Sequence, residues 1–309
     1  MKTRTYLLVA VLIAAVLAAA FIGTYLSEPP PSSSNSTSSV LHVVAAENFW
    51  GSLVSQLGGT HVQVLSIVTN PNADPHEYES NTADAEAIAK ANYVIVNGAG
   101  YDDWALELIS ASNTPGQKVL NVAALLGQAV GSNPHFWYDP YYVYATVHQM
   151  YLDLVSLAPN DTSYFTQQYA SLNASLAPYN AKINQIRAQF NGTEVASTES
   201  IFVYLANATG LALVSPTAFM QAVSEGNDPP AQSVVQFEQQ LQSGNVKVLV
   251  YNEQTITPLT SNMKTLASQN NVQVVGITET VYPTYASFQD WMNAELTALL
   301  NALSAKSSG

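Results

Sequence analysis

The chain has 309 residues, a formal net charge of −13 and only nine lysines and arginines. Nucleic-acid binding needs a basic surface that displaces counterions, and a chain this acidic offers none, so we expect no nucleic-acid partner. The sequence contains no cysteine, which excludes disulfides, thiolate metal sites, cysteine nucleophiles and a lipidated N-terminal cysteine. Hydrophobic residues make up 48% of the chain, enough for a sizeable core in one large α/β unit or two modest domains.

The N-terminus carries an uncharged apolar run, YLLVAVLIAAVLAAAFIGTYL, directly after Lys2 and Arg4. A run of about 20 residues can span a bilayer, and it exceeds the roughly 7–15 apolar residues of a cleaved signal. Positive charge before the run and none just after it put the rest of the chain outside the cell. We therefore expect 1–27 to be an uncleaved membrane anchor in preference to a cleaved signal, which would give a secreted protein. The Pro/Ser/Thr-rich segment 28–40 is expected to be an unfolded tether.

Five N-x-Ser/Thr sequons follow, at Asn35, Asn160, Asn173, Asn191 and Asn207. Chance produces several such sequons in a chain rich in Asn, Ser and Thr. They are compatible with an exported glycoprotein, because glycosylation of these sites occurs on exported chains.

From residue 41 onward, short β-branched runs alternate with helical patterns. Four such runs are expected to be strands: LHVVAA (41–46), HVQVLSIV (61–68), NYVIVNG (92–98) and KVLNVA (118–123). Helical patterns lie between them, and the helix 140–157 begins with a proline in its first turn. Strands that alternate with helices predict a parallel sheet covered on both faces.

The alternation breaks between Asn160 and Phe190, where apolar residues recur every three or four positions on one side of a long helix. Pro178 lies inside this stretch and is expected to kink or split the helix. Strands and helices then resume with EVAST (194–198), VKVLVYN (246–252) and VQVVGIT (272–278). The fold class we predict is α/β, with two parallel-sheet lobes, 41–160 and 192–309, joined by one long rigid helix, 161–191.

Two of the five histidines follow a proline in polar loops, His76 in NADPHEYES and His135 in SNPHFWYDP. Both lie past the ends of expected strands, and Glu199 and Glu279 directly follow the strands EVAST and VQVVGIT. Parallel sheets bind ligands in loops just past the carboxyl ends of their strands. Two imidazoles and two carboxylates suit Mn²⁺, Fe²⁺ or Zn²⁺.

Simpler interpretations of these residues stay open on the pattern alone. A loop histidine is usually just solvated, Glu199 could be a first-turn helix acid, and Glu279 could be a solvated loop acid. The other histidines, His42, His61 and His148, lie on strand or helix patterns and are expected to be structural.

The segments DPHEYES, NPHFWYDP, STESIFVYLANATGL and GITET…FQDWMNAEL, together with the long helix, resemble the metal-binding solute-binding proteins of ABC importers for zinc and manganese. The resemblance runs from residue 41 to the C-terminus. It implies two lobes joined by one rigid helix, with the metal between them. It also implies four metal ligands, namely His76, His135, Glu199 and Glu279. Glu225 and Asp228 in SEGNDPP are reserve candidates.

The function that this resemblance implies is an extracytoplasmic receptor, not an enzyme, that captures one Mn²⁺ or Zn²⁺ ion, or Fe²⁺, and delivers it to an ABC permease. We expect a monomer. In the family that the chain resembles, zinc importers often carry a histidine-rich loop before the second ligand, and their third ligand is more often histidine. This chain has no such loop and has Glu199 as the third ligand, which favours manganese or iron, although zinc generally binds a given site more tightly than manganese. The alternatives are a metal-dependent surface hydrolase and a glycosylated adhesin or structural protein. The sequence lacks H-E-x-x-H, G-x-S-x-G and phosphate-loop motifs.

Overall fold

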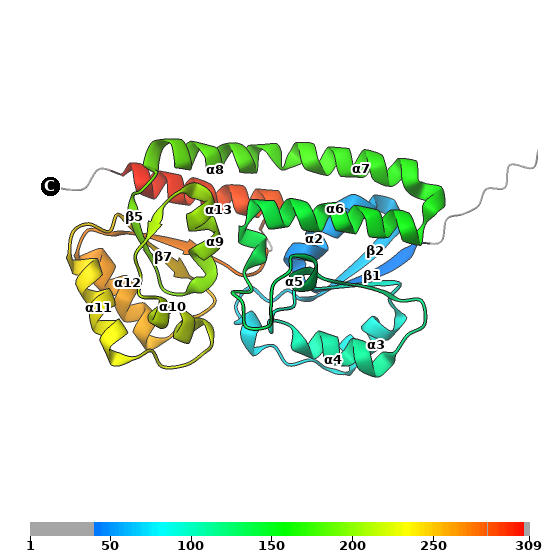
Figure 1. Ribbon diagram of the computed structural model, residues 1–309, viewed down its shortest axis with the longest axis horizontal. Coiled ribbons are helices and arrows are strands. Elements are labelled where there is room, and N and C mark those ends of the chain that lie inside the picture. The colour runs from blue at the N-terminus through cyan, green and yellow to red at the C-terminus, as the bar shows by residue number, and fades with distance from the viewer. Residues whose placement is uncertain (1–39, 283, 306–309) are drawn as a thin grey trace, which may run out of the picture. The chain divides into compact units, whose positions relative to one another are not determined.

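The structure is a computed structural model that describes residues 40–282 and 284–305 (Figure 1). The described residues belong to one compact unit. The expected anchor 1–27 and nearly all of the expected tether lie outside the described residues. Among the helices that are described, none has both the length and the apolar character that crossing a membrane requires.

The first lobe is built on a four-stranded parallel sheet with the order β2-β1-β3-β4. Its strands are β1 (Leu41–Glu47), β2 (Val62–Val68), β3 (Tyr93–Val96) and β4 (Lys118–Asn121). The crossover helices are α2 (Asn48–Gly58), α3 (Thr82–Lys90) and α4 (Asp103–Ser112), and the short helix α5 (Val122–Leu125) follows the last strand. All four residues of β3 are buried, as expected for a central parallel strand with helices on both faces.

The second lobe repeats this topology with the order β6-β5-β7-β8. Its strands are β5 (Glu194–Ser197), β6 (Ala212–Leu213), β7 (Val248–Asn252) and β8 (Gln273–Ile277). Its helices are α9 (Val203–Thr209), α10 (Thr217–Ser224), α11 (Ala231–Gln242) and α12 (Pro258–Gln269). In each lobe the second, first, third and fourth strands lie side by side in that order, which confirms the prediction of two parallel-sheet α/β lobes.

The long connection consists of two helices, α7 (Thr162–Ser175) and α8 (Ala177–Phe190), which follow α6 (Pro140–Leu157). They run end to end along one side of both lobes (Figure 1). The break falls at Leu176, directly before the first turn of α8, where Pro178 needs no N–H donor. The sequence therefore predicted both this connection between the lobes, α7 and α8, which we call the strut, and its interruption.

The strut is not the only connection between the lobes. The last helix, α13 (Phe288–Ser304), packs against α8 and β8 and also contacts α2 of the first lobe. One continuous hydrophobic core extends from the first lobe through the strut into α13. The side-chain amide of Asn48 also exchanges two hydrogen bonds of 2.9 Å with the backbone of Val281. The loops that carry the candidate site therefore lie on a shared core.

Five short 3₁₀ helices complete the part of the chain that the structure describes: η1 (Gly59–His61), η2 (Pro75–Glu77), η3 (Phe136–Tyr138), η4 (Pro159–Asp161) and η5 (Ser200–Phe202). Three of them, η2, η3 and η5, contain or directly follow a residue that the sequence proposed as a metal ligand.

Candidate metal centre

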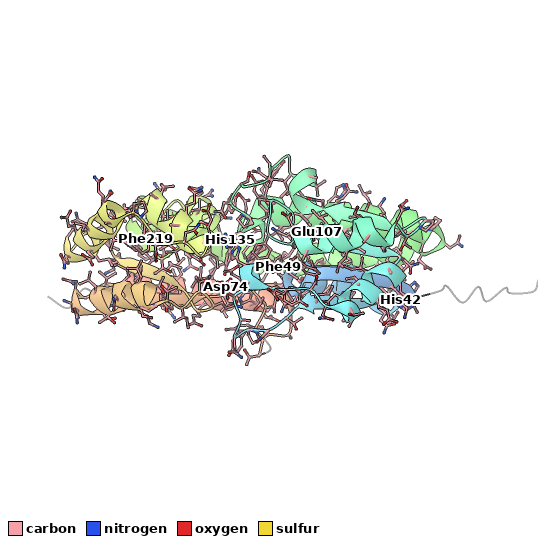
Figure 2. The ribbon with its side chains drawn as sticks, turned by 90° about the horizontal axis from the view of Figure 1, so that it is seen from below. His42, Phe49, Asp74, Glu107, His135 and Phe219 are labelled. Carbon is pink, nitrogen blue, oxygen red and sulfur yellow. The ribbon has the colours of Figure 1, made fainter. Side chains whose placement is uncertain are left out.

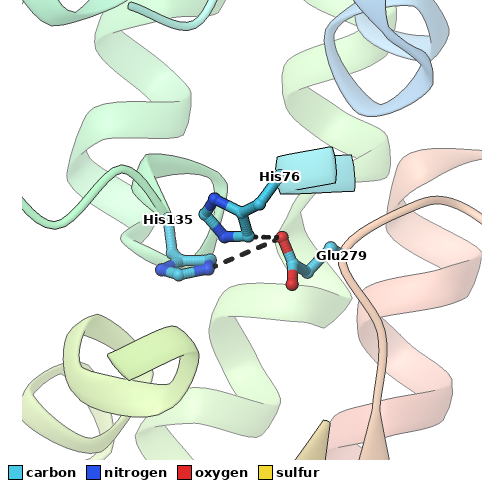
Figure 3. A group of neighbouring side chains, drawn as sticks. All are labelled: His76, His135 and Glu279. Atoms are coloured by element: carbon cyan, nitrogen blue, oxygen red, sulfur yellow. Dashed lines mark ion pairs between the residues drawn. The ribbon is translucent and has the colours of Figure 1, made fainter. Parts of the chain in front are cut away.

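His76, His135 and Glu279 come together between the two lobes, at the carboxyl-terminal ends of the sheets (Figure 3). One donor atom from each lies within 4.8 Å of the other two. Glu279 Oε2 is 3.4 Å from His76 Nε2 and 3.7 Å from His135 Nε2. Figure 3 shows both imidazoles directed at this single carboxylate oxygen. Figure 2 places His135 and Asp74 where the lobes meet.

His76 is held by a local cap. It is the central residue of η2, which starts with Pro75, and its backbone N–H donates to Asp74 Oδ1 at 2.9 Å. From the other lobe, Thr255 Oγ1 donates to Asp74 Oδ2 at 3.0 Å. The side chain of His76 keeps 22% exposure, so it is the most accessible member of the cluster. Its loop is therefore fixed from both lobes while its ring stays near the surface.

His135 is fully buried, and a neighbouring amide sets its tautomer. Asn133 Oδ1 lies 2.6 Å from the ring Nδ1, and Asn133 Nδ2 donates to the backbone oxygen of Ser200 at 2.8 Å. An amide oxygen can only accept, so Nδ1 carries the hydrogen and the lone pair of Nε2 faces Glu279. Burial lowers the pKa of His135 despite the nearby carboxylate, which keeps the ring neutral as a metal ligand must be.

Glu279 is fully buried and held by donors from both lobes. Tyr101 donates its hydroxyl to Oε2 at 2.8 Å, and Asn252 Nδ2 donates to Oε1 at 2.7 Å. Burial is the largest single influence and raises the pKa of Glu279, but His76, His135 and Tyr101 together outweigh it and lower the pKa to about 2. The carboxylate is therefore charged at the point where the two imidazoles converge.

Glu199 lies beside this cluster but outside it. It directly precedes η5 and is fully buried. Its Oε1 accepts a hydrogen bond from Asn252 Nδ2, while its Oε2 has no hydrogen-bond partner in the described part of the chain. Burial and repulsion from Glu279 raise the pKa of Glu199 well above its usual range. The structure thus joins Glu199 to Glu279 through one shared amide.

The sequence model of the family described as "Zinc-uptake complex component A periplasmic" matches residues 43–302. The chain belongs to this family. The manganese-binding lipoprotein MntA of Halalkalibacterium halodurans is 30% identical over 125 residues, which is 39% of this chain and 41% of that protein. The match therefore spans about two fifths of that relative.

Solved structures show the fold of this zinc-uptake family. The periplasmic zinc binding protein TroA from Treponema pallidum is similar with a TM-score of 0.73 and 16% identity, over 86% of this chain and 99% of TroA. A crystal structure of ZnuA gives a TM-score of 0.71 and 19% identity, over 86% of this chain and 100% of that one. At these identities the likeness shows the fold alone.

Two cavities border the centre in this member of the zinc-uptake family. One, of about 640 Å³, is lined by His76 and Tyr101 and by polar residues of both lobes. The other, of about 1000 Å³, lies beside the loop of His76; its lining is mostly uncharged but includes the acidic residues Asp74, Glu77, Glu79, Asp228 and Glu253. Carboxylates along a cleft raise the local concentration of cations. The centre therefore has one cavity that reaches a histidine and one whose lining includes acidic residues.

The reserve candidates and the remaining histidines lie elsewhere. Glu225 and Asp228 are exposed and belong to cavity walls rather than to the cluster. His61 pairs with Asp161, with 3.1 Å between Nδ1 and Oδ2, and the three-residue cluster contains neither His42 nor His148.

Three residues that the sequence did not single out hold the residues of the candidate metal centre in place by hydrogen bonds: Asp74, Tyr101 and Asn252. Asp74 is two residues before His76, Tyr101 follows the end of β3, and Asn252 is the last residue of β7. The signal that could have found Tyr101 and Asn252 is their position at or just past the carboxyl ends of strands, the same signal that found Glu199 and Glu279.

Proposed function

We propose that the chain is an extracytoplasmic solute-binding receptor that captures one divalent transition metal ion, Zn²⁺ or Mn²⁺, between its lobes and delivers it to an ABC permease. The observation that carries this proposal is a set of buried polar atoms aimed at one point. His76 Nε2 and His135 Nε2 have no hydrogen-bond partner in the described part of the chain, and both face Glu279 Oε2. Such atoms are rare in folded proteins, and a bound cation would satisfy them.

The proposed ligands are His76, His135, Glu279 and Glu199. Glu199 is included because its Oε2 is buried without a partner and its other oxygen shares an amide with Glu279. Two imidazoles and two carboxylates suit zinc, manganese and iron, and two carboxylate charges balance a divalent ion.

The division of the proposed ligands between the two lobes suggests how the metal ion would be released. Both histidines belong to the first lobe, and both glutamates belong to the second. Any separation of the lobes removes half of the proposed ligands from the ion at once. A permease that engages both lobes could release the metal in this way.

A receptor accounts for the centre better than an enzyme does. His135, Glu199 and Glu279 are all fully buried, which suits enclosure of an ion more than access of an organic substrate. The named relatives include a manganese-binding lipoprotein and a zinc-binding periplasmic protein. This chain has no cysteine to carry a lipid, so we propose that the apolar run in 1–27 anchors it as a monomer to the outer face of the membrane.

Metal binding and turnover separate this proposal from its rivals. The full chain, purified in mild detergent without a metal-affinity step, is loaded with Zn²⁺ or Mn²⁺, and bound metal is counted by elemental analysis. A receptor binds one ion per chain and hydrolyses no small ester or phosphate. Metal-dependent hydrolysis would support the enzyme, and failure to bind either metal would support the adhesin.

A further inference from the structure

Asn252 is the only side chain for which the described residues show hydrogen bonds to both Glu199 and Glu279. It is fully buried at the end of β7. Its Nδ2 donates to Glu279 Oε1 at 2.7 Å and to Glu199 Oε1, and Thr255 Oγ1 lies 3.1 Å from the same nitrogen. Its Oδ1 accepts from the backbone N–H of Gln254 at 2.9 Å, which fixes the side of the amide that faces the carboxylates.

This amide leaves each glutamate with one oxygen for a metal. The oxygen of Glu279 that Asn252 does not engage is Oε2, which accepts a hydrogen bond from Tyr101 at 2.8 Å and faces the two histidines. The free oxygen of Glu199 is Oε2, which has no partner among the described residues. An amide nitrogen carries two hydrogens and has no lone pair to give to a cation, so Asn252 occupies two carboxylate oxygens without adding a ligand.

We propose that Asn252 determines the metal preference of the site by restricting Glu199 and Glu279 to one coordinating oxygen each, which favours Zn²⁺ over Mn²⁺. The inference rests on the function proposed above. Two imidazole nitrogens and two single oxygens make four donors, the number that zinc takes in tetrahedral sites. Manganese belongs with cations that prefer larger, oxygen-rich shells. The amide therefore opposes the preference for manganese that a glutamate at 199 would otherwise give.

Removal of the donor should reverse this effect. In Asn252→Ala both N–H groups are lost, so Glu199 and Glu279 each regain a second oxygen that can reach the same ion. Asn252→Asp keeps the shape of the side chain but replaces the donor with a further oxygen. Both changes add oxygen donors around the ion, so both shift the preference toward manganese.

The test is a competition experiment on the full chain in mild detergent at pH 7.5. The dissociation constants for Zn²⁺ and Mn²⁺ are measured against a chromophoric chelator. We expect the ratio Kd(Mn)/Kd(Zn) to fall at least about tenfold in Asn252→Ala and Asn252→Asp, the scale of one hydrogen bond to a charged group. The control is Thr209→Val, at another buried polar residue of the second lobe, whose hydroxyl, among the described residues, bonds only to backbone oxygens of its own helix. Its ratio should equal that of wild type.

The outcomes separate the two proposals. A ratio that is unchanged or larger in a folded Asn252 variant overturns the inference while leaving the receptor intact. Failure of the wild-type chain to bind either metal overturns the proposed function itself. X-ray absorption of the zinc-loaded wild type decides the matter if both variants misfold. Four donors with each carboxylate bound through one oxygen support the inference, and a carboxylate bound through both oxygens refutes it.

Discussion

Glu295 of α13 should make the metal-free protein less stable as the pH rises through neutrality. Its carboxyl group is buried, and burial raises its pKa from the usual 4.5 to about 8 despite the hydrogen bonds it receives. The geometry agrees with a neutral acid. Oε1 accepts from Trp291 Nε1 at 2.8 Å and from the backbone N–H of Thr278 at 2.9 Å, and Oε2 lies 2.7 Å from the Tyr138 hydroxyl. That hydroxyl also contacts the backbone oxygen of Thr278 at 2.8 Å.

Tyr138 has one hydrogen and two acceptors, so a protonated Oε2 of Glu295 can donate to Tyr138 while Tyr138 donates to Thr278. This chain of hydrogen bonds ties η3 of the first lobe, directly after His135, to the residue before Glu279 in the second lobe. At a pH between the two pKa values the folded chain holds a proton that the unfolded chain has lost, so stability falls as the pH rises. The stabilisation that protonated Glu295 gives to the fold is fully present below pH 4.5 and is lost as the pH rises through about 8.

Between the two pKa values the free energy of unfolding should fall by about 1.4 kcal/mol per pH unit, or by about 2 kcal/mol from pH 6.0 to 7.5. The assay is urea unfolding of metal-free protein at several pH values, with Glu295→Gln as the matched variant. Glutamine is neutral at every pH, so in the variant the free energy of unfolding should no longer show the fall with pH that Glu295 causes. Equal slopes for wild type and Glu295→Gln over pH 6.0 to 8.5 would refute the reasoning.

Three further results are expected. His76→Ala should nearly abolish metal binding with little change in the circular dichroism spectrum, because this ring sits in a loop with 22% exposure; one ion bound at unchanged affinity would remove His76 from the site. Saturating metal, at about 1,000 times its dissociation constant, should stabilise the chain by about 4 kcal/mol; an unchanged Tm with both Zn²⁺ and Mn²⁺ would contradict the receptor. Burial and the nearby Glu279 raise the pKa of Glu199, so metal binding near neutral pH should release a proton from this residue. Calorimetry in two buffers should detect the release of fewer protons from Glu199→Gln than from wild type. Equal proton release from both chains would exclude Glu199 as the source.

Local patterns were sufficient for the elements and for the loops that bear the site. Strand and helix periodicity predicted seven of the eight strands that the structure describes, missing only the two-residue β6, and Pro178 predicted the interruption between α7 and α8. The position of His76 and His135 past strand ends of the first sheet predicted that they lie close together, because parallel strands of one sheet end at the same edge. The resemblance added that the two sheets face each other across one site.

Contacts between distant segments were beyond the sequence. The role of Asn252 depends on the side-by-side placement of β5, β7 and β8, which brings one amide within reach of two carboxylates. Nothing in the residues around Glu199 indicates that a donor from another strand bonds to its carboxylate. The contact of α13 with the first lobe depends likewise on packing between segments more than two hundred residues apart. The sequence therefore predicted the candidate residues but not the hydrogen bonds that orient them.

The most direct test of the central claim is anomalous X-ray diffraction from crystals of the chain grown with Zn²⁺ and, separately, with Mn²⁺. The account predicts one strong anomalous peak per chain, between His76 Nε2, His135 Nε2 and Glu279 Oε2, at about 2.0–2.2 Å from each donor for zinc. The same crystals of His135→Ala should lack that peak. A principal peak away from these three residues, or a peak that persists unchanged in His135→Ala, would contradict the claim that this cluster is the metal site.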